Sequence, residues 1–311
     1  MDNQYNMRSR HPKKKSTSRL VIFMALIALV IFLGFFSATQ YITAQSLQGK
    51  LRSLDQKIDQ LEEEQSELEN KYEEIYEENE RLREENQKLQ EENKMMRSEA
   101  LIEHGNRETN RVAITIDDGG SEEVNLLALD HLKELGVRAT LFPTGKNVEA
   151  YPESWKRAVK EGHELGNHTY GHPFLSNLSE ERVREELNGW QEMVEKVIGK
   201  TYHTPFFRPP YGDGFLSGQG YQRERLQPIV AEKGMFPIMW DIELVYALRN
   251  EAYTASRITE HVLQNAQGGS IVLLHFTEAD VEALPHIING LRERGLEPCS
   301  LRELLLSEPH S

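Results

Sequence analysis

The sequence is 311 residues long, enough for one large domain or two of ordinary size, and its formal net charge is −14. The charge is distributed unevenly. Residues 1–19 hold six basic and one acidic side chain, residues 20–45 hold none, and residues 46–98 hold nine basic and sixteen acidic ones. The remainder is acidic as well, which argues against nucleic acid as a partner, because phosphate binding needs a basic surface. The single cysteine, Cys299, excludes an intrachain disulfide and any cysteine-based metal cluster.

An uninterrupted apolar run, LVIFMALIALVIFLGFF, fills residues 20–36. About 20 such residues in a helix span a hydrocarbon core of about 30 Å, and a buried soluble helix would normally show a polar face. Because basic residues precede the run, we predict a cytoplasmic tail at 1–19 and a transmembrane signal anchor at 20–40, in contact with membrane lipid. A cleaved signal peptide is the alternative, with Ile-Thr-Ala at 42–44 as cleavage site, although its apolar core is commonly about 7–15 residues.

Residues 46–98 follow a seven-residue repeat. One seam position holds Leu47, Leu54, Leu61, Leu68, Ile75, Leu82, Leu89 and Met96, and its companion holds Leu51, Ile58, Gln65, Tyr72, Asn79, Asn86 and Asn93. Apolar residues at spacings of three and four, surrounded by Glu and Lys, predict a coiled-coil stalk rather than a single solvated helix. Asparagine repeated in the seam favours a parallel pair, so a parallel homodimer or pairing with another chain is expected. A helix of this length reaches about 75 Å beyond the membrane.

Residues 102–311 alternate between short β-branched runs and amphipathic helical patterns. The predicted strands are 112–116, 139–143, 235–240 and 270–274, and the predicted helices are 122–135, 153–160, 179–198 and 281–294. Ser179 is the expected N-cap of the third helix and Gly199 its stop, and Pro285 is expected to interrupt the fourth. This alternation predicts an α/β domain with a mainly parallel sheet, either doubly wound or barrel-shaped. The orientation expected for the anchor places this domain outside the cell.

Two polar clusters follow predicted strands or their connections, where α/β folds place reactive groups. The first, TIDDGG, brings Asp117 and Asp118 together at a strand end, where a cation would relieve the repulsion between them. By itself, an Asp-Asp-Gly sequence is more often just a turn. The second, NHTYGHP, places His168 and His172 four residues apart in what Gly171 predicts to be a loop. With a carboxylate, two such imidazoles can hold one metal ion, or both can simply face solvent.

Two further clusters are weaker signals on their own. The segment FRPPYG, residues 207–212, predicts a rigid loop that carries one cation, or a proline-stiffened turn without function. The segment LLHF, residues 273–276, places a histidine at the end of a buried strand, where a satisfied core residue is the common case. Neither cluster identifies a reaction by itself.

Taken together, in this order and spacing, the four clusters resemble the polysaccharide deacetylases (NodB-homology), carbohydrate esterase family 4. The resemblance covers residues 111–305 and includes the connecting sequences EGHELGNH at 161–168 and ATLFPTG at 139–145. It implies a distorted (β/α) barrel that hydrolyses an N-acetyl or O-acetyl group on a polysaccharide. Peptidoglycan, a chitin-like polymer and poly-N-acetylglucosamine are the substrates that such a resemblance suggests.

The resemblance also implies roles for single residues. Asp118, His168 and His172 would bind a divalent metal ion, zinc above all. Asp117 would be the general base that takes a proton from the attacking water. The ion would lower the pKa of that water and polarise the acetyl carbonyl.

Three more residues complete the implied site. The backbone N–H of Tyr211 would help to form the oxyanion hole, and His275 would be the general acid that protonates the departing sugar amine. Arg208 would orient Asp117 and tune its carboxylate by charge.

The sequence departs from the family at one place. By spacing, the usual Asp-Trp pair, of which the Asp supports the arginine and the Trp lines the substrate groove, is Tyr246-Ala247 here. Asp241 or Glu243 could take over the contact with Arg208. The departure keeps a second hypothesis open, a non-catalytic glycan-binding membrane scaffold. A third hypothesis keeps the fold but hydrolyses an acetyl ester or a small cyclic amide.

Overall fold

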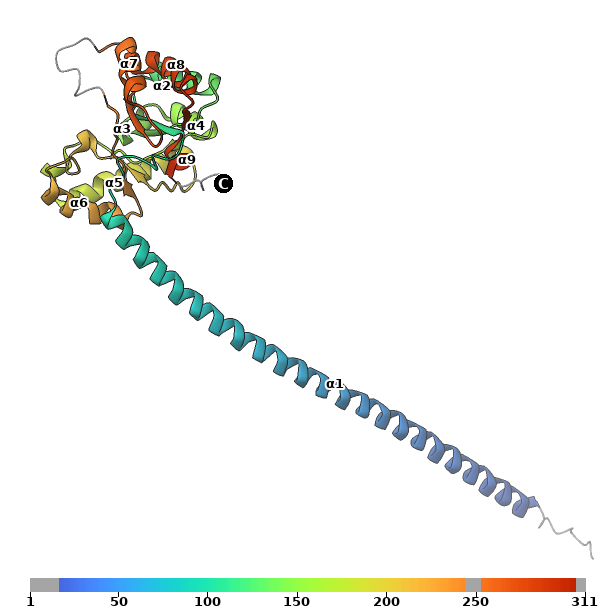
Figure 1. Ribbon diagram of the computed structural model, residues 1–311. Helices are drawn as coiled ribbons and strands as arrows, with labels where there is room; N and C mark the ends of the chain where they lie inside the picture. The colour runs from blue at the N-terminus through green and yellow to red at the C-terminus, as the bar shows by residue number, and fades with distance from the viewer. Residues whose placement is uncertain (1–16, 244–252, 306–311) are drawn as a thin grey trace, which may run out of the picture. The chain divides into compact units, whose positions relative to one another are not determined.

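The computed structural model describes residues 17–243 and 253–305 (Figure 1). They form two compact units, one up to Glu85 and the other from Asn86 on. Helix α1 (Thr17–Glu99) contributes its residues up to Glu85 to the first unit. Its remaining residues, from Asn86 on, belong to the second unit. Near its N-terminus α1 has a stretch of mean hydropathy 2.9 that is long and apolar enough to cross a membrane, a property that signal sequences share. The predicted tail at 1–19 lies almost wholly outside the described residues.

The heptad residues of α1 are helical, as predicted, and present their apolar side chains to solvent in the single chain. The large apolar seam residues from Leu47 to Met96 are between 44% and 70% exposed. Water contact along such a stripe is unfavourable, at about 25 cal/mol per Å² of apolar surface. Nothing within α1 can cover this stripe, because one continuous helix cannot fold back on itself.

The second unit is built on a parallel sheet, which confirms the predicted α/β class. The strand order is β3-β2-β1-β6, and β7 also pairs with β1. The strands are β1 (Arg111–Asp118), β2 (Thr140–Pro143), β3 (Glu164–Leu165), β6 (Ile271–His275) and β7 (Glu297–Cys299). The central strand β1 is buried along six consecutive residues, which explains its unbroken run of apolar and β-branched side chains.

Two short strands form a second parallel pair, β4 (Phe206–Phe207) and β5 (Phe236–Pro237). Isolated bridges connect this pair to the main sheet, because Asn167 pairs with Phe207 and Ile242 pairs with Val272 of β6. Backbone pairing therefore passes from β1 through β2, β3, β4 and β5 and returns to β6. The C-terminal ends of these strands face the same region, which is where parallel α/β folds place their reactive groups.

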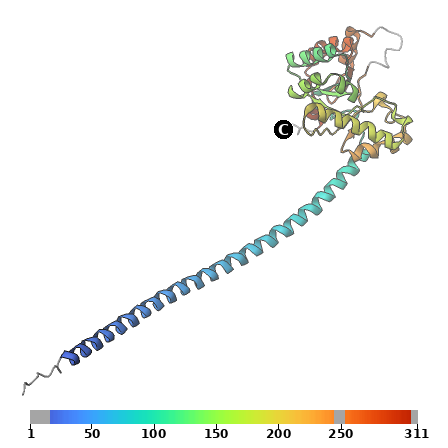
Figure 2. The same ribbon diagram turned by 180° about the vertical axis from the view of Figure 1, so that it is seen from behind.

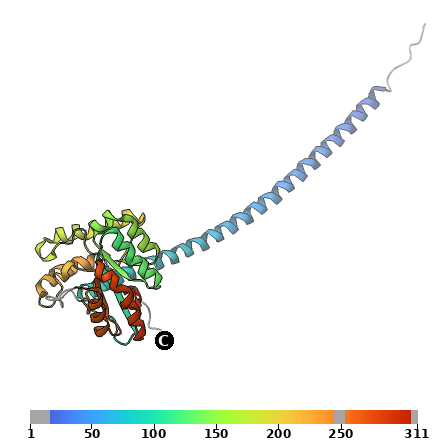
Figure 3. The ribbon, with the colours of Figure 1, turned by 90° about the horizontal axis from the view of Figure 1, so that it is seen from above.

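Helices connect the strands and cover the sheet. They are α2 (Glu122–Glu134), α3 (Gly145–Ala150), α4 (Pro152–Lys160), α5 (Glu180–Ile198), α6 (Gly220–Glu232), α7 (Ala255–Asn265), α8 (Glu278–Glu293) and α9 (Leu301–Leu305). Figure 1 shows α2, α7 and α8 as neighbours, and the views from behind and from above agree (Figures 2 and 3). The predicted ends of α5 are confirmed: Ser179 accepts the N–H of Arg182, and Gly199 is left-handed with φ of 75°.

The expected interruption at Pro285 is wrong, since α8 runs unbroken from Glu278 to Glu293. Proline removes one N–H from a helix and crowds the preceding turn. Here the tertiary environment outweighs that penalty, because the neighbouring side chains of α8 are fully buried in the main core. Those residues are Val281, Leu284, Ile287, Ile288 and Leu291.

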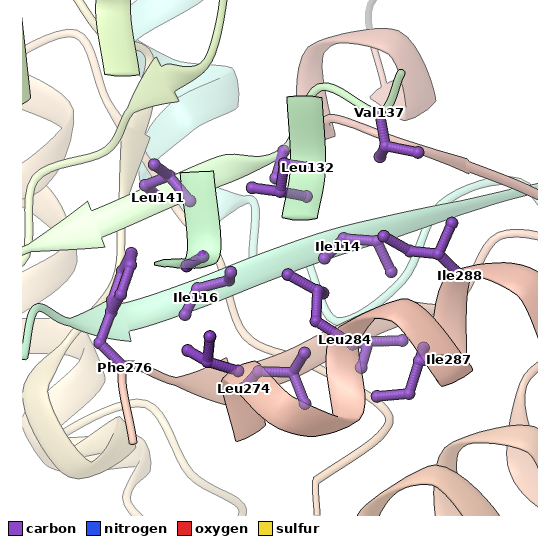
Figure 4. Close-up of a cluster of buried hydrophobic side chains, with 14 of the residues drawn as sticks. Ile114, Ile116, Leu132, Val137, Leu141, Leu274, Phe276, Leu284, Ile287 and Ile288 are labelled. Atoms are coloured by element: carbon purple, nitrogen blue, oxygen red, sulfur yellow. The ribbon is translucent and has the colours of Figure 1, made fainter. Parts of the chain in front are cut away.

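Side chains from β1, α2 and α8 meet in this core (Figure 4). Ile114 and Ile116 of β1 are at most 1% exposed and lie against Leu284 of α8 and Leu132 of α2. Burying one such side chain contributes roughly 1.5–3 kcal/mol. The central strand is thereby fixed, and with it the position of the residues that follow Ile116.

Candidate active site

Two adjacent carboxylates end β1. Asp117 is 3% exposed, and Asp118 adopts the left-handed conformation with φ of 75°. The carbonyl of Asp118 accepts the N–H of Thr144 at 3.0 Å, which ties this strand end to that of β2. Gly119 follows with φ of 87°, and a Cβ there would lie 2.3 Å from the Asn147 side chain, so glycine is required. The turn gives the two carboxylates different partners.

The two histidines lie in the loop after β3, as predicted, and one buried asparagine organises that loop. The side-chain amide of Asn167 donates to the carbonyl of Leu187 at 3.0 Å, and its oxygen accepts the N–H of Thr169 at 2.9 Å. The hydroxyl of Thr169 in turn accepts the N–H of His172 at 3.0 Å. This chain of hydrogen bonds fixes the backbone between His168 and His172.

Backbone strain is concentrated at this site. Throughout the described ranges, the non-glycine residues with positive φ are Asp118 (75°), Thr169 (62°), His172 (62°) and Tyr211 (61°). Each such conformation costs on the order of 1–3 kcal/mol and persists only where the surroundings enforce it. All four come from the turns that carry the candidate site, which marks this region as one shaped for function.

Asp118, His168 and His172 converge as predicted from the sequence. Their ligand atoms all lie within 4.8 Å of one another, with Oδ1 of Asp118 3.2 Å from Nε2 of His168 and 3.0 Å from Nε2 of His172. Oδ1 is buried, yet no contact gives it a well-formed hydrogen bond. Ligand atoms directed at a common point have this geometry. Four ligands around zinc with bonds of about 2.0–2.1 Å at tetrahedral angles would stand about 3.3 Å apart.

The tautomer of His168 suits a metal ligand. Its Nδ1 lies 2.8 Å from the backbone carbonyl of Arg208, and because a carbonyl can only accept, Nδ1 carries the proton. The lone pair of the neutral ring is then on Nε2, which points toward Asp118. An outer hydrogen bond of this kind commonly orients a metal-binding histidine.

The pKa values of Asp118 and His168 each depend on the charges beside them. Burial disfavours the charged form of Asp118, but the two nearby imidazoles outweigh it and hold the pKa of this carboxyl well below its usual range. Burial also disfavours imidazolium at His168, yet Asp117 and Asp118 raise the pKa of this ring. The pocket thus attracts positive charge, and a divalent cation on two imidazoles and one carboxylate would supply it.

Asp117 has a different partner, the fully buried Arg208. Its guanidinium donates to Oδ1 of Asp117 at 2.8 Å and to the hydroxyl of Thr115 at 2.7 Å, and it lies 4.3 Å from the ring centre of Phe142. Burial lowers the pKa of Arg208 while Asp117 opposes the shift, and a guanidinium stays protonated in either case. The Asp117 carboxylate is therefore held in one orientation by a buried cation.

The remaining guanidinium donors bond to backbone, at the carbonyls of Ile238 (3.2 Å) and Met239 (3.1 Å). The expectation that Asp241 takes over this contact is wrong. Asp241 accepts instead from Arg107 at 2.8 Å and from the hydroxyl of Ser270 at 3.0 Å. Two peptide carbonyls thus provide the support that a side-chain carboxylate was expected to give.

Glu243 lies in the cavity wall and accepts the indole N–H of Trp240 at 2.8 Å. Burial raises the pKa of Glu243, and its charge acts on Arg208 without a hydrogen bond between them. Trp240 also lines the cavity but was not predicted as a site residue. Its position at the end of a predicted strand could have indicated this. Tyr246-Ala247, at the usual Asp-Trp positions, lie outside the described residues.

All of the candidate site residues except Arg208 line one cavity of 180 Å³. His275 ends β6 directly beside Asp117 in the parallel register. The lining residues are Asp117, Asp118, His168, His172, Pro209, Tyr211, Trp240, Glu243, Leu273 and His275. Pockets that enclose drug-sized ligands measure about 300–1,000 Å³, so this one accepts a small substituent while the rest of a larger ligand stays outside.

Residues 104–226 match the family described as polysaccharide deacetylase. Two peptidoglycan-N-acetylglucosamine deacetylases of Bacillus cereus are 35% and 32% identical to this chain over 189 and 199 residues. The matches cover 59% and 62% of this chain, and 64% and 87% of those proteins. The chain belongs to the polysaccharide deacetylase family, carbohydrate esterase family 4. It spans less than two thirds of the first of these relatives.

The family also contains proteins without activity. The solved structure of a pseudoenzyme of this family from Bacillus anthracis has a TM-score of 0.58 to this chain and is 28% identical. The match covers 66% of this chain and 68% of that one. Membership alone therefore does not decide whether a chain is catalytic, and the residues of the site carry that argument.

Proposed function

We propose that this protein is a metal-dependent deacetylase that removes N-acetyl groups from an extracellular polysaccharide, with N-acetylglucosamine or N-acetylmuramic acid units of peptidoglycan as the first candidates. The observation that carries the proposal is that the two adjacent carboxylates contact different partners. Asp118 faces two imidazoles, 3.2 and 3.0 Å away, whereas Asp117 faces a buried guanidinium at 2.8 Å. One carboxylate suits a cation, and the other remains free to accept a proton.

Asp118, His168 and His172 would hold the ion, most suitably zinc, since two imidazoles and one carboxylate with an open position are a known catalytic zinc set. When bound, the ion would lower the pKa of a water and polarise the acetyl carbonyl. The three ligands line the 180 Å³ cavity, and His168 among them is almost fully buried, so charge interactions there are stronger than in bulk water.

The remaining residues supply proton transfer and orientation. Asp117 accepts the proton of the attacking water, and Arg208 holds this carboxylate in position through its hydrogen bond. The backbone N–H of Tyr211, in its strained left-handed turn, donates to the oxygen that gains charge. His275 donates a proton to the departing amine nitrogen, so the C–N bond breaks and acetate and a free amine result. Asp117 and His275 are neighbours in the sheet register and line the same cavity, so both can reach one bound acetyl group.

The proposed organisation of the chain follows the sequence pattern: a cytoplasmic tail at 1–19, a transmembrane anchor at 20–40, a stalk at 46–98 and the deacetylase domain at 102–311. The closed circuit of strand pairing supports a distorted barrel for that domain. The apolar stretch near the N-terminus and the relatives named for peptidoglycan support a place at the outer face of the cell membrane.

The stalk would pair with a second copy of the chain in parallel. Because Leu47 to Leu51 is a step of four, the leucine-rich series occupies heptad position d and the asparagine-containing series position a. Leucine at d with asparagine at a favours two parallel strands in fixed register. Light scattering of the detergent-solubilised full chain should give a dimer, and Leu61→Lys with Leu68→Lys should give a monomer. A monomeric wild type would exclude this pairing.

Acetate release and metal content test the catalytic proposal. The full chain, purified in detergent, should bind about one zinc ion and release acetate from N-acetylglucosamine oligomers or peptidoglycan. His168→Ala should lose both properties, Asp117→Asn should keep the zinc and lose activity, and His286→Ala, at an exposed position on α8, should keep both. Full acetate release by the His168→Ala variant would exclude a metal mechanism.

Two rival functions give different results in the same assay. A non-catalytic glycan-binding scaffold, which the pseudoenzyme relative and Tyr246-Ala247 support, would bind zinc and glycan while wild type and Asp117→Asn are equally inert. An esterase would release acetate from O-acetylated xylan but not from N-acetylated sugars. Comparing the two substrate classes at equal acetyl concentration separates these cases.

A further inference from the structure

A series of four aromatic rings leads from the metal triad to the protein surface. The ring centres of His168 and His172 are 4.9 Å apart, those of His172 and Tyr211 4.5 Å, and those of Tyr211 and Phe174 4.1 Å. The first two contacts are edge-to-face, whereas the outermost pair is stacked with 13° between the ring planes. The series therefore ends in two nearly parallel rings.

Exposure rises along this series. The side chain of His168 is 3% exposed and that of His172 22%, and Tyr211 and Phe174 reach 43% and 49%. From Ile102 on, the large apolar residues that are exposed in the described part of the chain are Leu127, Phe174, Tyr211, Leu216 and Tyr221. Stacking the two phenyl rings against each other beside the cavity leaves about half of each in water, which is a cost unless a ligand covers them.

Tyr211 belongs to both parts of this arrangement. Tyr211 lines the 180 Å³ cavity, and its ring stacks on that of Phe174, farther from the metal triad. A cavity of that size holds an acetamido group but not the sugar that carries it. The sugar rings of the substrate must then lie at the mouth, next to this pair.

We propose that the stacked pair of Phe174 and Tyr211 is a sugar-binding platform, on which a pyranose ring next to the acetylated unit lies with its C–H face against the aromatic surface. This inference rests on the proposed function, because it assigns the site a glycan substrate. The axial C–H groups of a pyranose carry slight positive charge and complement the electron-rich face of an aromatic ring. Such contact is apolar and directional, so it selects sugar polymers over small acetylated molecules.

The experiment compares binding and hydrolysis in one set of variants. The full chain in detergent is titrated calorimetrically with the tetramer and the monomer of N-acetylglucosamine, with zinc removed by chelator, and acetate release is measured separately with zinc present. Phe174→Ala should weaken binding of the tetramer about tenfold and lower the tetramer-to-monomer ratio of kcat/KM by a similar factor. Phe174→Trp should keep the tetramer affinity, because it retains an aromatic face.

Leu127→Ala is the matched control, since it truncates an apolar side chain of similar exposure (45%) on α2. It should leave tetramer binding unchanged. Equal tetramer affinity in wild type and Phe174→Ala would refute the platform, as would a wild type that binds no tetramer. Weaker tetramer binding by Phe174→Ala in a protein that releases no acetate would support the platform and refute the proposed deacetylase activity.

Discussion

Replacing Arg208 by methionine tests the pairing on which the proposed base depends. The guanidinium is 0% exposed and donates to Asp117, Thr115 and two backbone carbonyls. Methionine fills a similar volume and contacts Phe142 without charge. The variant therefore leaves the Asp117 carboxylate, 3% exposed, without its partner.

The expected cost follows from the desolvated charge. Removing one partner of a buried ion pair destabilises a protein by about 3–5 kcal/mol, and acceptors that lose a hydrogen bond add roughly 1 kcal/mol each. We expect about 7 kcal/mol for Arg208→Met, which breaks the pair and leaves three other acceptors without their donor, and about 3 kcal/mol for Asp117→Asn, which leaves the arginine unpaired. The double variant contains neither charge and should cost about 4 kcal/mol, well below the sum of the two, because the pair is lost only once.

Urea unfolding followed by tryptophan fluorescence measures these values. Trp155, Trp190 and Trp240 all belong to the second unit, so α1 does not contribute to the signal. The measurements should contain chelator, which removes stabilisation by bound metal. Additive costs in the double variant would refute the reasoning, since they would mean that Arg208 and Asp117 act independently.

Three further predictions concern stability and metal. Burial lowers the pKa of His163 to about 4 from 6.5. The unfolded chain therefore binds a proton that the folded one does not between these values, and stability should fall by about 3 kcal/mol as pH drops from 6.5 to 4. His163→Asn should lack this component in a comparison of unfolding free energies at both ends of that range, and an unchanged pH dependence would contradict it. A Cβ at Gly166 would lie 2.1 Å from the Phe142 ring, so Gly166→Ala should cost about 1–3 kcal/mol, whereas Gly220→Ala, with open space, should cost nothing by the same urea assay. Zinc at about a thousand times its Kd should stabilise the protein by about 4 kcal/mol, equivalent to roughly 8–16 °C in Tm, and His172→Ala should show no shift when chelator is added.

Local signals made part of the fold predictable from the sequence. The helix from 180 to 198 has a serine N-cap and a left-handed glycine at its end, and these residues act within one turn of the backbone they terminate. The convergence of Asp118, His168 and His172 was expected from the family resemblance, because position in the sequence alone left a plain turn and solvent-facing histidines open. The types of these three side chains, and their order along the chain, are what indicates metal binding.

Other features depend on tertiary context and leave little trace in sequence. Pro285 lies inside a continuous helix because buried neighbours hold it there. The support of Arg208 by the carbonyls of Ile238 and Met239 was not predictable, since every residue has a carbonyl and only the fold directs these two inward. Strands of two residues, such as Phe206–Phe207, are too short to show the alternation of apolar and polar side chains by which a strand is recognised in a sequence.

The contrast between Asp117 and Asp118 has an evolutionary consequence. The proposed function assigns proton transfer and cation binding to successive residues that contact different neighbours, so a single codon change would abolish one while leaving the other. If the proposed function holds, a descendant that lost only the acidic group at 117 would keep the metal triad and the glycan surface, and would bind the polymer without modifying it. The return path is equally short, because restoring one carboxylate would restore the missing chemistry.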